Sequence, residues 1–135
     1  MTYEEKKAWL WRYRDAEKLF RQLACRLEEA RTAARRTTQN LSAAPGGSGD
    51  GQNLARAVER EDDLDRQASF QLAECQALFE EIDVALQQLE DYQSYRVLKG
   101  YDLDLLTWDQ VAKEMNYSLR MVFILRRKAM EQLQL

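Results

Sequence analysis

Two pairs of carboxylates are the residues in this sequence whose type and spacing could do chemistry. Glu59 and Asp62 are three positions apart along the chain, and so are Glu80 and Asp83. Residues at this spacing lie on one face of a helix. Paired carboxylate oxygens on one face could hold a hard cation such as Mg²⁺, which bridges phosphates. The alternative interpretation is a solvated acidic helix face.

The two pairs resemble the magnesium-binding pattern of all-α nucleotide pyrophosphohydrolases. That family carries its pairs on separate helices, whereas both pairs here fall on one predicted helix, and Asp62 stands where the first pair normally has Glu. Ile82 faces the predicted helix seam, which turns Glu80 and Asp83 outward. We therefore favour the solvated face and predict no catalytic residue, no metal site and no cofactor. The sequence contains no His, which excludes His-based catalysis and His-ligated metals.

A glycine-rich segment at residues 42–51 (SAAPGGSGDG) could suggest a loop that binds phosphate. Such a loop needs a preceding strand and a Lys-Ser or Lys-Thr ending, and the sequence has neither. We predict instead a flexible linker at residues 42–53. Cys25 and Cys75 lie on or beside apolar helix faces, so we expect packed thiols rather than reactive ones. Two cysteines among long polar helices also favour a cytoplasmic protein.

Composition limits the fold class and the location. The chain has 135 residues, 32% charged residues, one Pro and five Gly, and this shortage of turn residues argues against a β-sandwich or barrel. No apolar run reaches the roughly 18 residues of a membrane-spanning helix, and the first residues do not resemble a secretory signal. The net charge of −3 is uneven, because basic residues dominate positions 1–41 and 105–135 while acidic ones dominate positions 42–104.

Hydrophobic periodicity predicts an all-α protein with two long helices. From Trp9 to Ala34 apolar residues recur at alternating spacings of four and three, and the same pattern runs from Ala68 to Leu89 within a second helix predicted at residues 54–92. The linker would let the two helices pair as an antiparallel hairpin at residues 1–91, the basic helix against the acidic one. The predicted core and dimer seam comprises Trp9, Tyr13, Phe20, Leu23, Leu27, Leu72, Phe79, Ile82, Leu86 and Leu89.

A two-helix hairpin buries little apolar surface by itself. We therefore expect a second copy to complete a four-helix arrangement in a homodimer. An antiparallel hairpin would also bring Trp9, Trp11 and Tyr13 close to Tyr95 and the C-terminal segment. These rings predict an aromatic junction rather than a surface for stacking bases.

Residues 92–135 form the second predicted domain, and most of its signals lie in residues 107–133. Thr107 and Gln110 have the spacing of a capping box, which begins a short helix. Asn116 can take the left-handed conformation of a tight turn, and Ser118 can cap a second helix. Helix, short turn, cap and helix are the layout of a helix-turn-helix.

This segment resembles the fourth conserved region of bacterial sigma factors. The whole chain also resembles small sigma-region-4-like proteins encoded by phages and prophages of Gram-positive bacteria, in which two long helices precede the same module. One departure is Leu105, which stands where a Gly is common. The resemblance implies a transcription regulator in the cytoplasm of a bacterial host, with duplex promoter DNA and RNA polymerase as partners. The matching residues are Thr107, Val111, Ala112, Met115, Ser118, Val122, Leu125, Ala129, Met130 and Leu133.

The predicted recognition helix departs from the sigma-factor pattern because several of its groove-facing positions, among them Leu119, Phe123 and Ile124, are apolar. Apolar side chains can touch a thymine methyl group but cannot hydrogen-bond base edges. Two functions therefore stay open: DNA binding, or a degenerate helix-turn-helix that docks a protein partner. The residues predicted to bind DNA are Lys113, Ser118, Leu119, Arg120, Phe123, Ile124, Arg126, Arg127 and Lys128.

Overall fold

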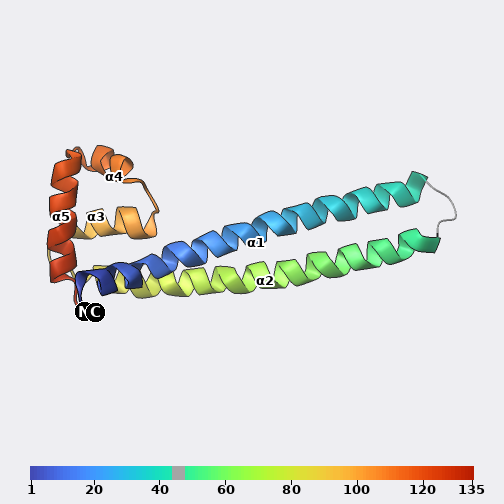
Figure 1. Ribbon diagram of the computed structural model, residues 1–135, viewed down its shortest axis with the longest axis horizontal. Coiled ribbons are helices and arrows are strands. Elements are labelled where there is room, and N and C mark those ends of the chain that lie inside the picture. Colours follow the sequence, from blue (N-terminus) through green and yellow to red (C-terminus); the bar gives the residue numbers. More distant parts are fainter. Residues whose placement is uncertain (44–47) are drawn as a thin grey trace. The chain divides into compact units, whose positions relative to one another are not determined.

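The computed structural model describes the backbone of residues 1–43 and 48–135 and the side chains of residues 1–39 and 51–135. The protein is all-α, and no strand occurs in these ranges. None of the described helices is both long enough and apolar enough to cross a membrane. The elements are α1 (Tyr3–Ala43), α2 (Ser48–Leu86), α3 (Tyr92–Leu98), a short π-helix η1 (Lys99–Leu103), α4 (Trp108–Met115) and α5 (Leu119–Gln132), as drawn in Figure 1.

The boundaries of the second long helix differ from those predicted. Of the predicted linker, residues 44–47 lie outside the described residues, while α2 already begins at Ser48. A glycine inside a helix lowers its stability by about 1 kcal/mol relative to alanine but does not prevent the helix from forming. At the other end α2 stops at Leu86 rather than near Tyr92, because Asp91 caps a new helix by accepting a hydrogen bond from the Gln93 amide at 3.1 Å.

The chain forms two compact units whose limits differ from the predicted division at residue 92. Unit 1 comprises Met1–Ala16 and Cys75–Leu135, and unit 2 comprises Glu17–Glu74. The difference arises because the beginning of α1 and the end of α2 pack with the C-terminal helices, while the remainder of both long helices pack with each other.

Unit 2 consists of parts of α1 and α2 that pair in antiparallel fashion (Figure 1). Its core consists of small and medium-sized apolar residues. Beside it, the guanidinium of Arg31 lies 3.5 Å from the Glu61 carboxylate and 3.9 Å from the Asp65 carboxylate. These two carboxylates occupy positions of α2 where the heptad pattern would place apolar residues. Their ion pairs with Arg31 of α1 account for charged residues at these positions. The core residues are Leu23, Leu27, Ala30, Leu64 and Ala68, with Phe20 packed against them.

Most residues of the predicted core and dimer seam are buried or half-buried. Leu72 is 41% exposed, since the buried positions of α2 in this region are Leu64, Ala68 and Cys75. Cys25 is exposed, contrary to the packed thiol that we expected, whereas Cys75 is buried. Of the other predicted seam residues, Leu23, Leu27, Ile82, Leu86 and Leu89 are buried, and Trp9, Tyr13, Phe20 and Phe79 are half-buried.

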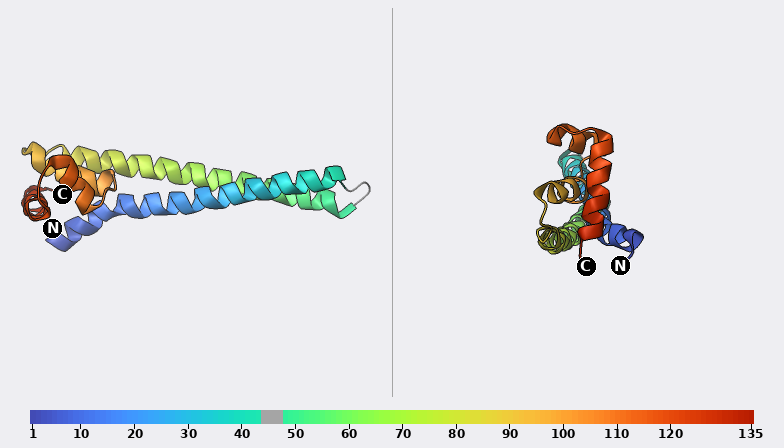
Figure 2. Two further views of the ribbon diagram at one scale, coloured as in Figure 1. Left: turned by 90° about the horizontal axis from the view of Figure 1, so that it is seen from above. Right: turned by 90° about the vertical axis from the view of Figure 1, so that its left-hand side faces the viewer.

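Unit 1 contains two apolar clusters. In the first, Leu10 of α1 packs with Ile82 and Leu86 of α2 and with Ala129 and Met130 of α5. Figure 2 shows α5 crossing the beginning of α1, and the Lys6 ammonium donates to the Met130 carbonyl at 2.8 Å. The second cluster joins α3, α4 and α5 and consists of Val97, Val111, Ala112, Val122 and Leu125.

A tight connection joins η1 to α4. The Leu106 amide donates to the Gly100 carbonyl at 3.0 Å, and a Cβ at Gly100 would lie 3.3 Å from Val111 Cγ2. Leu105, which directly precedes Leu106, has a φ of 57°, in the left-handed region. Leu pays roughly 1–2 kcal/mol for this conformation, which a Gly would adopt freely.

Candidate nucleic-acid interface

Local backbone features define the start of α4 and the turn between α4 and α5. The Thr107 hydroxyl accepts from the Gln110 amide at 3.2 Å, while the Gln110 side chain accepts from the Thr107 amide at 2.9 Å, which completes the predicted capping box. Asn116 has φ of 57° and ψ of 38°, the left-handed conformation expected for it. The Ser118 hydroxyl then accepts from the Met121 amide at 3.2 Å and caps α5.

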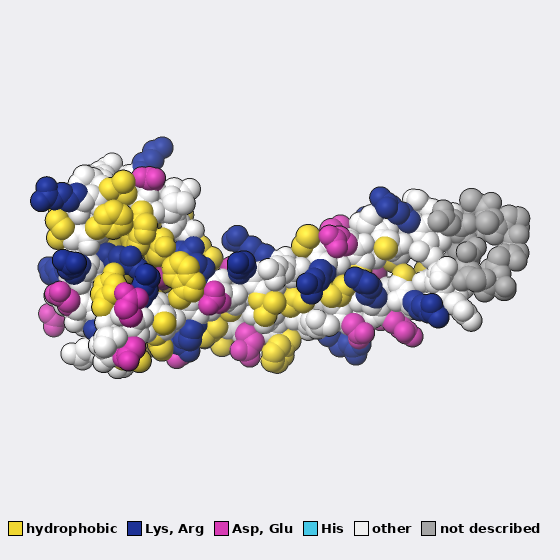
Figure 3. Space-filling model, in the orientation of Figure 1, with side chains coloured by type: hydrophobic (Ala, Val, Ile, Leu, Met, Phe, Trp, Pro, Cys, Tyr) yellow, Lys and Arg dark blue, Asp and Glu magenta, His cyan; other side chains and the backbone are white. Residues whose placement is uncertain are grey.

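The second apolar cluster fixes the rotation of α5 about its axis. Val122, Leu125 and Ala129 are buried. Because a helix turns once every 3.6 residues, Arg120, Ile124 and Arg127 lie on the opposite, outward side. Figure 3 shows hydrophobic and basic side chains mixed on one face of unit 1. The face of α5 made by Arg120, Phe123, Ile124 and Arg127 is called the outward face below.

Most residues predicted to bind DNA are exposed on α4, on α5 or at the cap between them. Phe123 is 46% exposed and Ile124 is 53% exposed. The Phe123 ring makes an edge-on contact with the Trp108 ring, their centroids 5.5 Å apart, which holds Phe123 against α4. Lys113, Ser118, Leu119, Arg120, Phe123, Ile124, Arg127 and Lys128 are all exposed.

Arg126 differs from the other predicted DNA-binding residues because it is half-buried. Its guanidinium lies 4.7 Å from the centroid of Trp108 and 5.5 Å from that of Tyr101, and these two rings stack on each other at 3.8 Å. Its Nε atom is buried and has no hydrogen-bond partner within the described residues. This geometry packs the Arg126 guanidinium against aromatic rings, while Arg126 also lines an open groove beside α5.

Arg14 on α1 also contacts the Tyr101 ring. Its guanidinium lies 4.6 Å from the centroids of both Trp11 and Tyr101, and it donates to the Tyr101 carbonyl at 2.7 Å. Trp11 and Tyr101 are themselves 6.2 Å apart. The predicted aromatic junction between the beginning of α1 and the C-terminal segment is therefore present, with Arg14 and Arg126 inserted among the rings.

Asp102 is the buried carboxylate of this junction, with 3% of its surface exposed. Its Oδ2 atom has no hydrogen-bond partner among the described residues. Burial raises the pKa of Asp102 to about 6, and the positive charges of Arg126 and Arg14 offset part of that rise. Desolvation therefore outweighs the attraction of the two guanidinium groups.

Asp91 connects the start of α3 to α5. Its carboxylate accepts from the Gln93 amide, from the Ser94 hydroxyl at 3.1 Å and from the Lys128 ammonium at 3.4 Å. These hydrogen bonds lower the pKa of Asp91, and the one from the Gln93 backbone amide has the largest effect. Because Lys128 already has a carboxylate partner, it is less available to a phosphate than Arg120 or Arg127.

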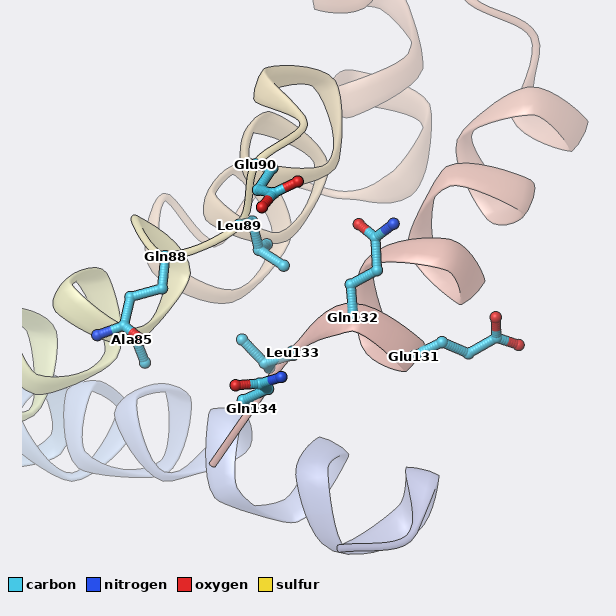
Figure 4. Close-up of a pocket in the computed structure, with 8 residues that line it drawn as sticks. All are labelled: Ala85, Gln88, Leu89, Glu90, Glu131, Gln132, Leu133 and Gln134. Carbon is cyan, nitrogen blue, oxygen red and sulfur yellow. The ribbon is translucent and has the colours of Figure 1, made fainter.

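Two hollows of unit 1 border α5. An open groove of about 1090 Å³ runs along the outward face and includes Arg120, Phe123, Ile124 and Arg127 in its lining. A second hollow of about 370 Å³, shown in Figure 4, lies between the end of α2 and the end of α5. Amides and carboxylates such as Gln88, Glu90, Glu131 and Gln132 line it, so it lacks the cations that an acidic polymer needs.

Comparison with protein-family models, curated proteins and solved structures gave no match.

Both carboxylate pairs, Glu59 with Asp62 and Glu80 with Asp83, lie in the part of the chain that the structure describes. No group of three or more His, Cys, Asp or Glu residues there could hold a metal ion. Asp83 instead accepts a hydrogen bond from the Tyr95 hydroxyl at 2.9 Å and another from the Gln87 amide group. Burial, followed by these interactions with Asp83, raises the pKa of Tyr95.

Sequence reasoning missed the polar centre of the aromatic junction. Arg14 follows the predicted seam residue Tyr13, and Asp102 lies in the apolar stretch around Leu98 and Leu103. A charged residue in such a stretch is a signal, but only the tertiary structure brings Arg14 and Arg126 to the Tyr101 ring and within electrostatic reach of Asp102.

Proposed function

We propose that this protein is a DNA-binding transcription regulator in which residues 107–133 act as a helix-turn-helix. The observation that carries the proposal is the pair Arg120 and Arg127, both exposed on the outward face and without an ion pair among the described residues. In a helix-turn-helix the second helix enters the major groove while the first crosses the backbone. α5 and α4 would take these roles.

The cations of α4 and α5 suit two kinds of DNA contact, one with backbone phosphates and one with base edges. Lys113 on α4 is exposed and suits a backbone phosphate. Arg120 and Arg127 lie on the outward face of α5, where a guanidinium can bind a phosphate or the O6 and N7 atoms of guanine. Lys128 would have to leave Asp91 first, and Arg126 remains among its aromatic rings.

The long helices would serve assembly. The core of unit 2 is small, and its exposed apolar residues include Val58, 45% exposed, and Leu72, 41% exposed. These two residues are 14 positions apart on α2, which is two heptads, so they lie near one face of the helix. A second copy covering them would form a homodimer that presents two α5 helices to one duplex. The resemblance to sigma factor region 4 adds RNA polymerase as a partner and the cytoplasm of a bacterial host as the location.

A salt titration with duplex DNA tests the proposal. We expect the logarithm of the binding constant to fall steeply and linearly with the logarithm of salt concentration, because each neutralised phosphate releases counterions. Arg127→Ala should flatten that slope by about one unit. Arg21→Ala is the matched control, since Arg21 is an exposed cation of unit 2. Affinity no higher for DNA than for an acidic protein would refute DNA binding.

The second candidate function is docking of a protein partner. The observation in its favour is that four apolar side chains of α5 are exposed, namely Leu119, Met121, Phe123 and Ile124. Leu119→Asp would then abolish capture of purified RNA polymerase while leaving the unfolding temperature unchanged. Under the first proposal the same variant weakens DNA binding through the added negative charge.

A further inference from the structure

The outward face of α5 combines two apolar side chains with two guanidinium groups. Arg120, Ile124 and Arg127 follow one another at spacings of four and three, and Phe123 lies beside them in the same open groove. At 1.5 Å per residue, Ile124 lies about 6 Å along the axis from Arg120 and about 4.5 Å from Arg127. Base pairs are stacked about 3.4 Å apart. Each apolar side chain is thus within one or two base-pair steps of a guanidinium.

The two apolar side chains restrict what this face can recognise. A base edge in the major groove offers hydrogen-bond donors, acceptors or the C5 methyl group of thymine, and only the methyl group suits an aliphatic or aromatic side chain. A base pair without that methyl group would place Ile124 or Phe123 against polar atoms that lose their water and gain no hydrogen bond, which is unfavourable.

The structure also holds Phe123 ready for such a contact. Its ring packs edge-on against Trp108, and Trp108 stacks on Tyr101 at 3.8 Å with an interplanar angle of 11°. Arg126 covers the Trp108 ring. A ring supported in this way loses little side-chain freedom on binding, so more of the contact energy appears as affinity.

We propose that Ile124 and Phe123 recognise thymine methyl groups, so that the preferred ligand is duplex DNA with neighbouring thymines in the major groove beside α5. Arg120 and Arg127 supply the flanking contacts to phosphates or guanine. This inference rests on the proposed function, because it requires α5 to lie in the major groove. Burying one methyl group against an apolar side chain corresponds to about a fourfold gain in affinity, and two methyl groups to about a tenfold gain or more.

Replacing thymine by deoxyuridine removes only the methyl group and therefore tests the proposal. A sequence is first selected by the full-length protein from a pool of random 24-base-pair duplexes and then remade with deoxyuridine in place of thymine. We expect the deoxyuridine duplex to bind about tenfold more weakly with the same salt slope. Ile124→Ala should bring the two affinities to within about fourfold of each other, and Ile124→Ala with Phe123→Ala should make them equal.

Val84→Ala is the matched control, because Val84 is an exposed apolar residue of α2 in unit 1, 58% exposed, and should leave the thymine preference unchanged. Ile124→Val, which keeps a branched apolar side chain, should retain most of the preference and guards against loss of folding in the Ala variants. Equal affinity for both duplexes with a steep salt slope would overturn thymine recognition and leave DNA binding intact. Absence of salt-dependent binding to either duplex would overturn the proposed function and this inference together.

Discussion

At the residue scale, Leu105 occupies a backbone position that requires a left-handed conformation. Its φ of 57° is in the left-handed region, and only Asn116 among the other described non-glycine residues has a positive φ. Asn tolerates this conformation through its short polar side chain, whereas Leu has no such compensation. Since Leu105 is half-buried, contacts of its side chain offset part of the strain.

Substitutions at Leu105 should rank by their ability to adopt that conformation. We expect Leu105→Gly to change the free energy of unfolding by less than about 1 kcal/mol, because relief of strain balances lost contacts and chain entropy. Leu105→Val should destabilise by about 1–3 kcal/mol, since a β-branched residue fits this region poorly. Urea unfolding measures both. A Val variant as stable as the Gly variant would contradict the assignment of strain.

Asp102 should make stability depend on pH. Its pKa is raised to about 6, above the ordinary value of 3.8, so the folded state binds the proton more tightly than the unfolded state does. The contribution of Asp102 is therefore most favourable below about pH 4 and is lost as the pH rises through 6, a change of about 3 kcal/mol in the free energy of unfolding.

Asp102→Asn should remove that dependence. The wild-type free energy of unfolding minus that of the Asn variant should fall by about 3 kcal/mol between pH 3 and pH 7. Asp104→Asn is the control, because Asp104 is nearby but exposed. Parallel wild-type and Asp102→Asn curves across this range would show that Asp102 titrates alike in both states.

At the scale of elements, the helices themselves could be predicted because their signals are local. The Thr107 and Ser118 caps and the Asn116 turn are encoded within a few residues, and all three occur in the structure as expected. The end of α2, the π-helix η1 and the exposure of Leu72 could not be read in the same way. The first two depend on how the C-terminal helices of unit 1 pack, and the third on how α1 and α2 pair in unit 2, none of which periodicity specifies.

A substitution at the helix cap of α5 should change the stability of the protein without changing its DNA binding. Ser118→Ala removes the acceptor for the Met121 amide and should lower the free energy of unfolding by about 1 kcal/mol. The salt slope of DNA binding should stay unchanged, since no charge is lost. A flatter slope together with unchanged stability would instead mean that Ser118 contacts the DNA backbone.

At the scale of the whole molecule, the account includes self-association through the long helices. Light scattering at micromolar concentration should give about twice the mass of one chain. Val58→Asp with Leu72→Asp should shift the protein toward monomer, because both side chains are exposed apolar residues near one face of α2 in unit 2. Val84→Asp, at an exposed apolar position of unit 1, is the matched control. A stable wild-type monomer would contradict the dimer.

The central claim is that the outward face of α5 binds duplex DNA, and an NMR titration of the full-length protein with a duplex tests it most directly. We predict that amide chemical-shift changes concentrate at residues 118–128, with further changes at Lys113, and that they fade as salt is added. Shift changes confined to residues outside α4 and α5, or no changes at saturating DNA, would contradict the claim.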